Sequence, residues 1–120
     1  MVKNINEKNC FDTLKKLVNS QLIDVRTPRE WQDDGYADLT SLKKKLYFVT
    51  WTESEDAFFN QIKNLNFKQE ETLFFICRSG IRSANAVNFL INKCMGDSCY
   101  NVEGGMEYGW KALNLPISLK

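Results

Sequence analysis

Residues 72–83 read Thr72-Leu73-Phe74-Phe75-Ile76-Cys77-Arg78-Ser79-Gly80-Ile81-Arg82-Ser83, and this stretch decides the expected fold. Its first five residues are mostly apolar, which predicts a buried strand. The following residues, 84–91, are apolar at positions 86, 87, 90 and 91 and so predict a helix with one buried face. A cysteine therefore stands between a strand and a helix, in a loop with one glycine and two arginines.

Cys77 is the candidate nucleophile of the chain. The loop amides, the dipole at the helix N-terminus and two fixed positive charges would all favour a reactive thiolate. The chain contains no histidine, so every Ser-His or Cys-His arrangement is excluded. A helix terminus contributes only about 0.3–1 kcal/mol. Loop amides and at least one arginine therefore have to supply the rest of the activation.

Arginine is used sparingly and in two places only. Of 16 basic residues, only four are arginines, and they fall in residues 24–30 and 77–83. Arginine offers a planar set of donors that suits carboxylates and other anions, whereas lysine serves solubility equally well. We therefore expect Arg78 and Arg82 to act at the site, and Arg26 and Arg29 to be structural.

Length and composition predict one globular domain, residues 1–120. The hydrophobic share of 43% and the charged share of 26% are ordinary for such a domain. A net charge of +1 gives no reason to expect a nucleic-acid partner. We find no apolar leader and no membrane-spanning run, and so expect a cytoplasmic protein with reduced cysteines and no membrane association. Without histidine or a C-x-x-C pair, we expect neither a metal site nor a cofactor.

Alternating signals along the chain predict an α/β fold. Helices are expected over residues 7–19 (with Leu14, Leu17 and Val18 inward), 28–35, 55–64 and 84–91, with a last turn at 109–113. Strands are expected at residues 21–25, 46–51, 72–76 and 100–102. Strands that are apolar throughout and separated by helices indicate a central parallel β-sheet flanked by helices on both faces. Ligands bind at the carboxyl ends of such strands, where Asp24, Cys77 and Gly104 would converge.

Three ordered motifs carry a family resemblance. They are residues 22–31, the loop at residues 77–83, and Val102-Glu103-Gly104-Gly105 with Trp110. Together they resemble the rhodanese-like sulfurtransferases in their single-domain form, from about residue 5 to residue 117. Residues 36–70 match that family weakly, because Gly35-Tyr36-Ala37 stands where the family often has a glycine-histidine-isoleucine segment.

The resemblance implies a double displacement at Cys77. The cysteine would take the outer sulfur of a donor such as thiosulfate as a persulfide, and a thiol or cyanide would accept it. A sulfur-relay protein is a further possible partner. The loop would bind substrate through the residues Arg78, Ser79, Gly80, Ile81, Arg82 and Ser83. Their amides would ring the terminal sulfur, the two arginines would orient the donor, and Ser83 would serve chiefly as the cap of the following helix.

The resemblance also implies residues that support the loop. Asp24 would bond to neighbouring amides, and Arg26 would pair with Glu30 beneath the site. Gly104 and Gly105 would let the backbone approach the loop closely.

Three other interpretations stay open at the sequence level. A Cys-dependent phosphatase or arsenate reductase needs five residues between cysteine and arginine, and here Arg82 follows Cys77 after four. A non-catalytic rhodanese-like interaction module would commonly lose the cysteine or its flanking charge, and both are present. Cys94 or Cys99 could act as a resolving thiol, although a simple packing role is the stronger hypothesis for both.

Overall fold

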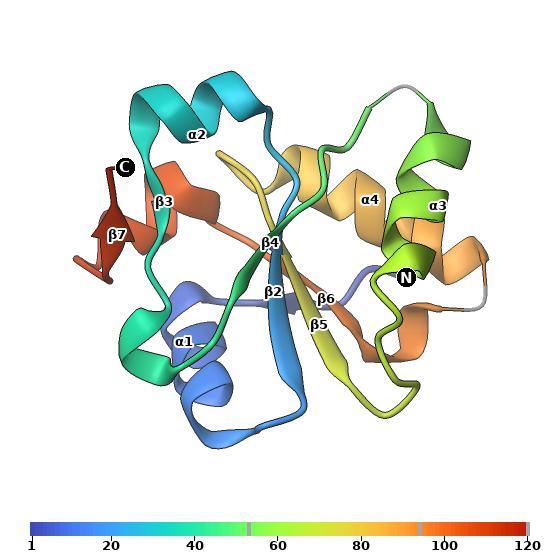
Figure 1. Cartoon of the computed structure of the whole chain (residues 1–120), viewed down its shortest axis with the longest axis horizontal. Coiled ribbons are helices and arrows are strands. Elements are labelled where there is room, and N and C mark those ends of the chain that lie inside the picture. The colour runs from blue at the N-terminus through green and yellow to red at the C-terminus, as the bar shows by residue number, and fades with distance from the viewer. Residues whose placement is uncertain (53, 94, 120) are drawn as a thin grey trace.

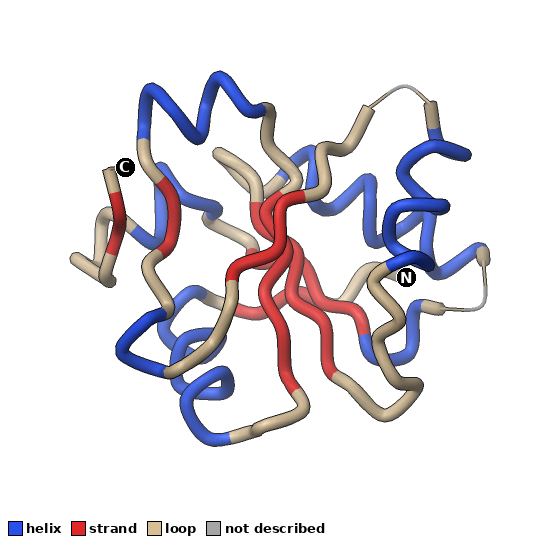
Figure 2. The backbone as a smooth tube through the Cα atoms, in the orientation of Figure 1, coloured by secondary structure: helices blue, strands red, loops and turns tan. Residues whose placement is uncertain are grey.

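The computed structural model describes residues 1–52, 54–93 and 95–119, and they form one α/β body (Figures 1 and 2). Its centre is a five-stranded, all-parallel sheet in the order β1-β6-β5-β2-β4. The strands are β1 (Asn4–Ile5), β2 (Ser20–Asp24), β4 (Leu46–Phe48), β5 (Thr72–Ile76) and β6 (Cys99–Val102). The predicted fold class is therefore confirmed.

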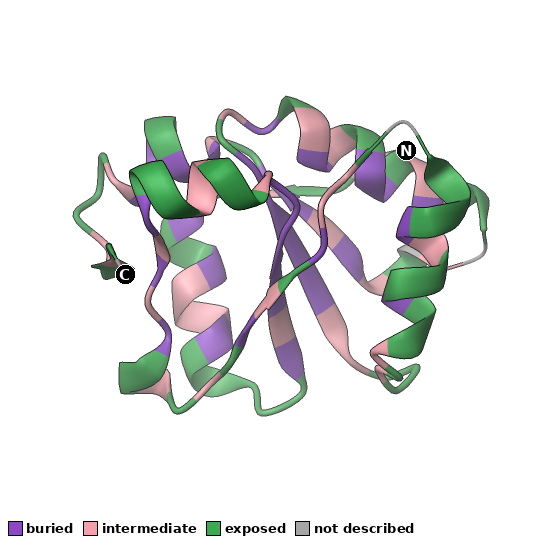
Figure 3. Cartoon of the chain, turned by 45° about the horizontal axis from the view of Figure 1, so that its top comes forward, coloured by how far each residue is buried: buried purple, intermediate pink, exposed green. Residues whose placement is uncertain are grey.

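Helices cover both faces of this sheet. Helices α3 (Glu55–Asn64) and α4 (Ile81–Asn92) pack on one face, around a cluster that includes Phe58, Phe75 and Leu90. The other face packs on α1 (Glu7–Lys16) and the π-helix η3 (Met106–Trp110), around Leu14, Phe74 and the fully buried Trp110. Figure 3 shows that the central strands are mostly buried, as the burial of β2 and β5 requires. β5 and β2 lie at the centre, so the loop after β5 emerges from the best-packed part of the core.

Helix α2 (Pro28–Asp34) begins as the sequence predicts. Thr27 accepts a hydrogen bond from the amide of Glu30, the Glu30 carboxylate accepts from the Thr27 amide, and Pro28 occupies the first turn. The helix ends at Gly35, whose φ of 76° is in the left-handed region. This capping box fixes where the Glu30 side chain leaves the helix.

Four expected boundaries differ from the structure by three residues, and the first is that α4 begins at Ile81 rather than at residue 84. Helix α1 ends at Lys16, so Leu17 and Val18 are 50% and 82% exposed and do not face the core. β4 ends at Phe48 rather than at residue 51. The last helical segment is η3, which begins three residues before the expected turn at 109–113.

The sequence analysis predicts none of several short elements, because they have too few residues to show a hydrophobic period. They are β1, the antiparallel pair β3 (Tyr36–Ala37) and β7 (Ile117–Ser118), and the 3₁₀-helices η1 (Thr40–Leu42) and η2 (Gly96–Ser98). No helix among the described residues is both long enough and apolar enough to span a bilayer.

Candidate active site at the loop after β5

Cys77 lies directly after β5, with its side chain turned inside the loop that leads to α4. The residue is 1% exposed. Its Sγ accepts hydrogen bonds from the amides of Gly80, at 3.1 Å, and Ser83, at 3.3 Å. The Ser83 hydroxyl lies 3.2 Å from the same sulfur. Of the six amides in residues 78–83, these two reach Sγ, so the expected ring of six is only partly formed around the cysteine sulfur itself.

Gly80, and not Ser83, is the N-cap of α4, which corrects the role expected for the serine. Gly80 has a φ of 93°, a conformation that residues with a Cβ rarely adopt. A Cβ at this position would also collide with the carbonyl of Glu103. With the glycine ending the loop, Ser83 sits in the first turn of the helix. There it is fully buried, and its hydroxyl points to the sulfur.

A buried hydrogen-bond chain continues from the sulfur into the sheet. The Ser83 hydroxyl oxygen lies 2.5 Å from Oδ1 of Asn101, a β6 residue that is 3% exposed. The Asn101 Nδ2 donates to Oδ1 of Asn4 at 3.0 Å, and these two asparagines are register partners in β6 and β1. Nothing in the sequence singles out Asn101, because one polar residue in a short strand has no motif of its own.

Arg82 reaches from α4 to α2 and is held there by Glu30. Its two terminal nitrogens donate to the two carboxylate oxygens at 2.7 and 2.8 Å. These bonds lower the pKa of Glu30 to about 2, even though partial burial acts in the opposite direction. The same carboxylate raises the pKa of Arg82. The expected pairing of Arg26 with Glu30 is therefore wrong.

Arg26 pairs with Asp24 instead, and both side chains are almost completely buried. Its Nη2 donates to the Asp24 carboxylate at 2.8 Å and to the carbonyl of Gly35 at 2.8 Å. Asp24 also accepts from the Arg26 amide at 3.0 Å, which confirms the expected bond to a neighbouring amide. Because Asp24 and Ile76 are register partners, this pair lies at the sheet edge from which Cys77 emerges.

Gly105 brings the backbone after β6 against the cysteine loop, as expected. A Cβ on Gly105 would lie 2.5 Å from the Arg78 carbonyl oxygen, and the glycine has a φ of 66°. The next two amides, of Met106 and Glu107, donate to the carbonyls of Cys77 and Arg78 at 2.8 and 2.9 Å. These bonds fix the backbone of Cys77 and Arg78 against the start of η3.

Gly104 has a different neighbour from the one expected. Its amide donates to the carboxylate of Glu7 at 2.6 Å, and Glu7 is 4% exposed on α1. That carboxylate also occupies the space beside Gly109, where a side chain would collide with it. Gly104 thus supports the loop indirectly, by tying the segment after β6 to α1.

The other cysteines lie away from this site. Cys99 pairs in register with Leu73, four residues before Cys77, so it lies roughly 13 Å back along the sheet. Burial raises the pKa of the Cys99 thiol to about 12, and it donates to the carbonyl of Met95. Burial, with the nearby Glu7 carboxylate, also raises the pKa of Cys10. Cys94 lies outside the described residues.

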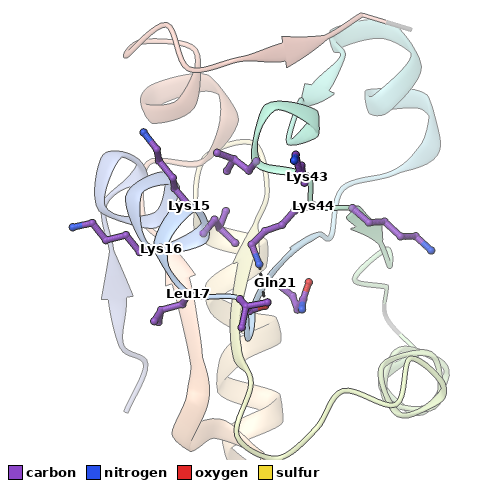
Figure 4. A pocket seen from close by; sticks show the side chains of 10 residues that line it. Lys15, Lys16, Leu17, Gln21, Lys43 and Lys44 are labelled. Carbon is purple, nitrogen blue, oxygen red and sulfur yellow. Dashed lines mark hydrogen bonds between the residues drawn. The ribbon is translucent and has the colours of Figure 1, made fainter.

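A lysine-lined hollow of about 410 Å³ lies at the opposite end of β2 (Figure 4). It is lined by Lys15 and Lys16 at the end of α1 and by Lys43, Lys44 and Lys45 in the turn before β4. The Lys44 ammonium donates to the carbonyls of Val18 and Ser20, just before and at the start of β2. The hollow lies beside the start of β2, whereas Cys77 follows Ile76, the register partner of Asp24 at the end of β2. The hollow therefore takes no part in chemistry at Cys77.

Comparison with known sequences gives a family match over almost the whole chain. A family model described as the STR4 middle domain matches residues 3–120. A protein of Rickettsia rickettsii, described as an uncharacterized RP600 homolog, is 40% identical over 121 residues. The match covers 96% of each of the two chains.

Comparison with solved structures gives the same fold. Rv0390 from M. tuberculosis superposes with a TM-score of 0.83 at 26% identity, over 99% of this chain and 98% of its own. A rhodanese-like domain protein from Staphylococcus aureus has a TM-score of 0.64 at 28% identity, over 99% of both chains. A polysulfide-sulfur transferase from Wolinella succinogenes has a TM-score of 0.77 at 21% identity, over 98% of this chain and 78% of its own.

Proposed function

Because this chain belongs to the rhodanese-like family, we propose that it is a sulfurtransferase that works through a persulfide on Cys77. The observation that carries the proposal is the sulfur held by the amides of Gly80 and Ser83 at the start of α4. Such donors stabilise a sulfur anion without any imidazole, and the chain has none. The polysulfide-sulfur transferase of similar fold agrees with this chemistry.

The reaction has two displacements. The Cys77 thiolate attacks the outer sulfur of a thiosulfate-like donor, the sulfur–sulfur bond of the donor breaks, and sulfite leaves with the bonding electrons. A nucleophilic acceptor, a thiol or cyanide, then attacks the outer sulfur of the persulfide and regenerates the thiolate. Loop amides that do not reach Sγ, such as those of Ser79 and Ile81, are the donors we assign to the outer, anionic sulfur.

The two loop arginines have different roles in this proposal. Arg78 is exposed, and among the described residues no carboxylate forms an ion pair with it. Arg82 has its terminal nitrogens on Glu30. We therefore assign recognition of the donor anion chiefly to Arg78, while Arg82 adds a fixed positive charge beside the sulfur.

The rim of the loop suits a protein acceptor as well as a small thiol. Ile81 follows Gly80 directly and is 69% exposed, and Tyr108, next to the amide that binds the Arg78 carbonyl, is 66% exposed. These apolar groups give a sulfur-relay protein something to contact beside the cysteine. The proposal places the reaction in the cytosol, where thiol acceptors are kept reduced, and involves neither nucleic acid nor a membrane.

The test is sulfur uptake measured by intact-protein mass. Incubation with thiosulfate is expected to add the mass of one sulfur atom, which cyanide then removes with release of thiocyanate. Cys77→Ser is expected to take up none, and Cys99→Ser to behave like the parent. Uptake that survives in Cys77→Ser, or no uptake by the parent from thiosulfate or a polysulfide, would overturn the proposal.

The assignment of Arg78 has its own matched control. Arg78→Ala is expected to raise the KM for thiosulfate about tenfold or more, since it removes a charge-assisted contact. Arg29→Ala removes another exposed arginine, whose partner is Asp33 on α2, and it is expected to leave the KM unchanged. Equal effects of the two variants would show that only the overall charge matters.

A further inference from the structure

We propose that Asn101 is a positioning residue that decides where the Ser83 hydroxyl proton points, and through it the balance between thiol and thiolate at Cys77. The inference rests on the proposed function for its biological meaning, but its geometry stands alone. Asn101, Ser83 and Cys77 are each no more than 3% exposed, so their polar atoms have to satisfy one another.

The hydroxyl of Ser83 has one proton and two neighbours that can accept it. Sγ of Cys77 lies 3.2 Å from the oxygen, and Oδ1 of Asn101 lies 2.5 Å from it. A hydroxyl can donate only once, although it can also accept. The proton therefore serves the asparagine or the sulfur, but not both.

With Cys77 as a thiol, a complete chain of donors and acceptors exists. The S–H donates to the Ser83 oxygen, the hydroxyl donates to Asn101 Oδ1, and Asn101 Nδ2 donates to Asn4 Oδ1. This is the arrangement in which the structure places the two asparagine amides. In this state the Ser83 hydroxyl and the Asn101 amide oxygen both have partners.

With Cys77 as a thiolate, the chain has to reverse. The Ser83 hydroxyl then donates to the sulfur, and the Asn101 Oδ1 loses its donor. Turning the Asn101 amide over lets Nδ2 donate to the Ser83 oxygen, while Oδ1 accepts from Asn4 Nδ2. Asn4 is exposed and can turn with it. An asparagine can serve both states because its amide both donates and accepts, and the thiol proton leaves to solvent water.

The charged groups around this chain belong to the elements packed against the loop. They are Arg78 in the loop, Arg82 on α4 with its partner Glu30 on α2, the Asp24–Arg26 pair at the end of β2, Lys3 before β1, Glu7 on α1, and Glu103 and Glu107 after β6. Among the described residues, none of their side chains hydrogen-bonds to Ser83, Asn101 or Asn4. Substitution of Asn101 therefore changes the hydrogen-bond chain and leaves these ion pairs in place.

The test is the pH dependence of Cys77 alkylation by iodoacetamide, in a background carrying Cys94→Ser. Desolvation raises the pKa of Cys10 and of Cys99, so those thiols stay protonated and are alkylated slowly. Asn101→Leu removes the Oδ1 acceptor, so only a Cys77 thiolate remains as a good acceptor for the Ser83 hydroxyl proton. The midpoint of the alkylation profile is therefore expected to fall by about one pH unit, which is a tenfold increase in thiolate population below the midpoint. Asn101→Asp offers only acceptors and adds charge, so the midpoint is expected to rise.

A double-mutant cycle separates this role from packing. Without the hydroxyl, in Ser83→Ala, Asn101→Leu is expected to shift the midpoint by less than a third of its effect in the parent. A shift that persists in full, or one of the same sign for the leucine and aspartate variants, would overturn the inference. If thermal unfolding shows that Asn101→Leu does not fold, the same cycle is measured with Asn101→Asp. A midpoint shift for Asn101→Asp that is as large in the Ser83→Ala background as in the parent would then overturn the inference.

Alkylation needs no sulfur donor, so the role of Asn101 and the proposed sulfurtransferase reaction can each be refuted without the other. Sulfur uptake from thiosulfate without the expected midpoint shifts would refute the role of Asn101 and leave the sulfurtransferase intact. Midpoint shifts without sulfur uptake would leave the hydrogen-bond chain standing and refute the proposed reaction.

Discussion

Replacing Glu30 with glutamine isolates the charge of the Glu30–Arg82 bridge. Glutamine at the third position of a helix still completes a capping box with Thr27, so the start of α2 is preserved. The bridge lowers the pKa of Glu30 from 4.5 to about 2. A shift of that size corresponds to about 3 kcal/mol. Because 21% of the Glu30 side chain and 35% of the Arg82 side chain face solvent, we reduce the expected contribution to about 1–2 kcal/mol.

The sign of the pH dependence follows from the lowered pKa. The carboxylate stabilises the folded state fully above the unfolded-state pKa of 4.5, and this stabilisation is lost as pH falls toward 2. The parent is therefore expected to exceed Glu30→Gln by about 1–2 kcal/mol in free energy of unfolding at pH 7. By pH 3 somewhat more than half of that difference is expected to have disappeared. The measurement is urea unfolding followed by tryptophan fluorescence at the two pH values.

Asp33→Asn supplies the matched control on the same helix. Its partner Arg29 is 90% exposed and the Asp33 side chain 59%, so loss of this pair is expected to have little effect at either pH. A cost for Glu30→Gln that is the same at pH 7 and pH 3 would refute the electrostatic reasoning. So would an equal cost for Asp33→Asn.

Three further predictions concern the surroundings of the cysteine. Asp24→Asn leaves Arg26 charged and unpaired in the core, so it is expected to lower the free energy of unfolding by about 3–5 kcal/mol, measured in urea at pH 7. A loss below about 1 kcal/mol would contradict this prediction. Gly105→Ala places a Cβ against the Cys77 and Arg78 carbonyls at a φ of 66°, so we expect a lower melting temperature together with slower Cys77 alkylation. With its pKa raised to about 12, Cys99 is expected to stay unlabelled by Ellman's reagent at pH 8 in the folded protein, and rapid labelling would show that its segment opens.

Features determined by neighbouring residues could be predicted from the sequence. The capping box at Thr27, the glycine end of α2 and the strand before Cys77 each depend on a few consecutive side chains, and the structure confirms all three. The order of helices and strands around the parallel sheet follows from the same local signals. The family resemblance adds to this the relation between the loop and Gly105.

Features determined by pairing across the fold could not be predicted. Arg26 and Glu30 are four residues apart, which suggests a helical pair, but Arg26 lies before the cap and its side chain follows the strand end to Asp24. Glu30 then finds a partner 52 residues away. Asn101 meets Ser83 only because β5 and β6 are neighbours. Sequence spacing carries no information on either contact.

The same contacts favour the proposed sulfur chemistry over phosphate chemistry at the loop. The amides of Gly80 and Ser83 lie 3.1 and 3.3 Å from Sγ, so they solvate the cysteine sulfur itself. A loop that binds a tetrahedral oxyanion has to place its amides around oxygens that lie beyond the sulfur, and it needs an arginine free to clamp two of them. Here Arg82 follows the cysteine one residue too early and its terminal nitrogens are on Glu30. The persulfide that we propose would add a single atom to Sγ, and we assign its binding to the remaining loop amides.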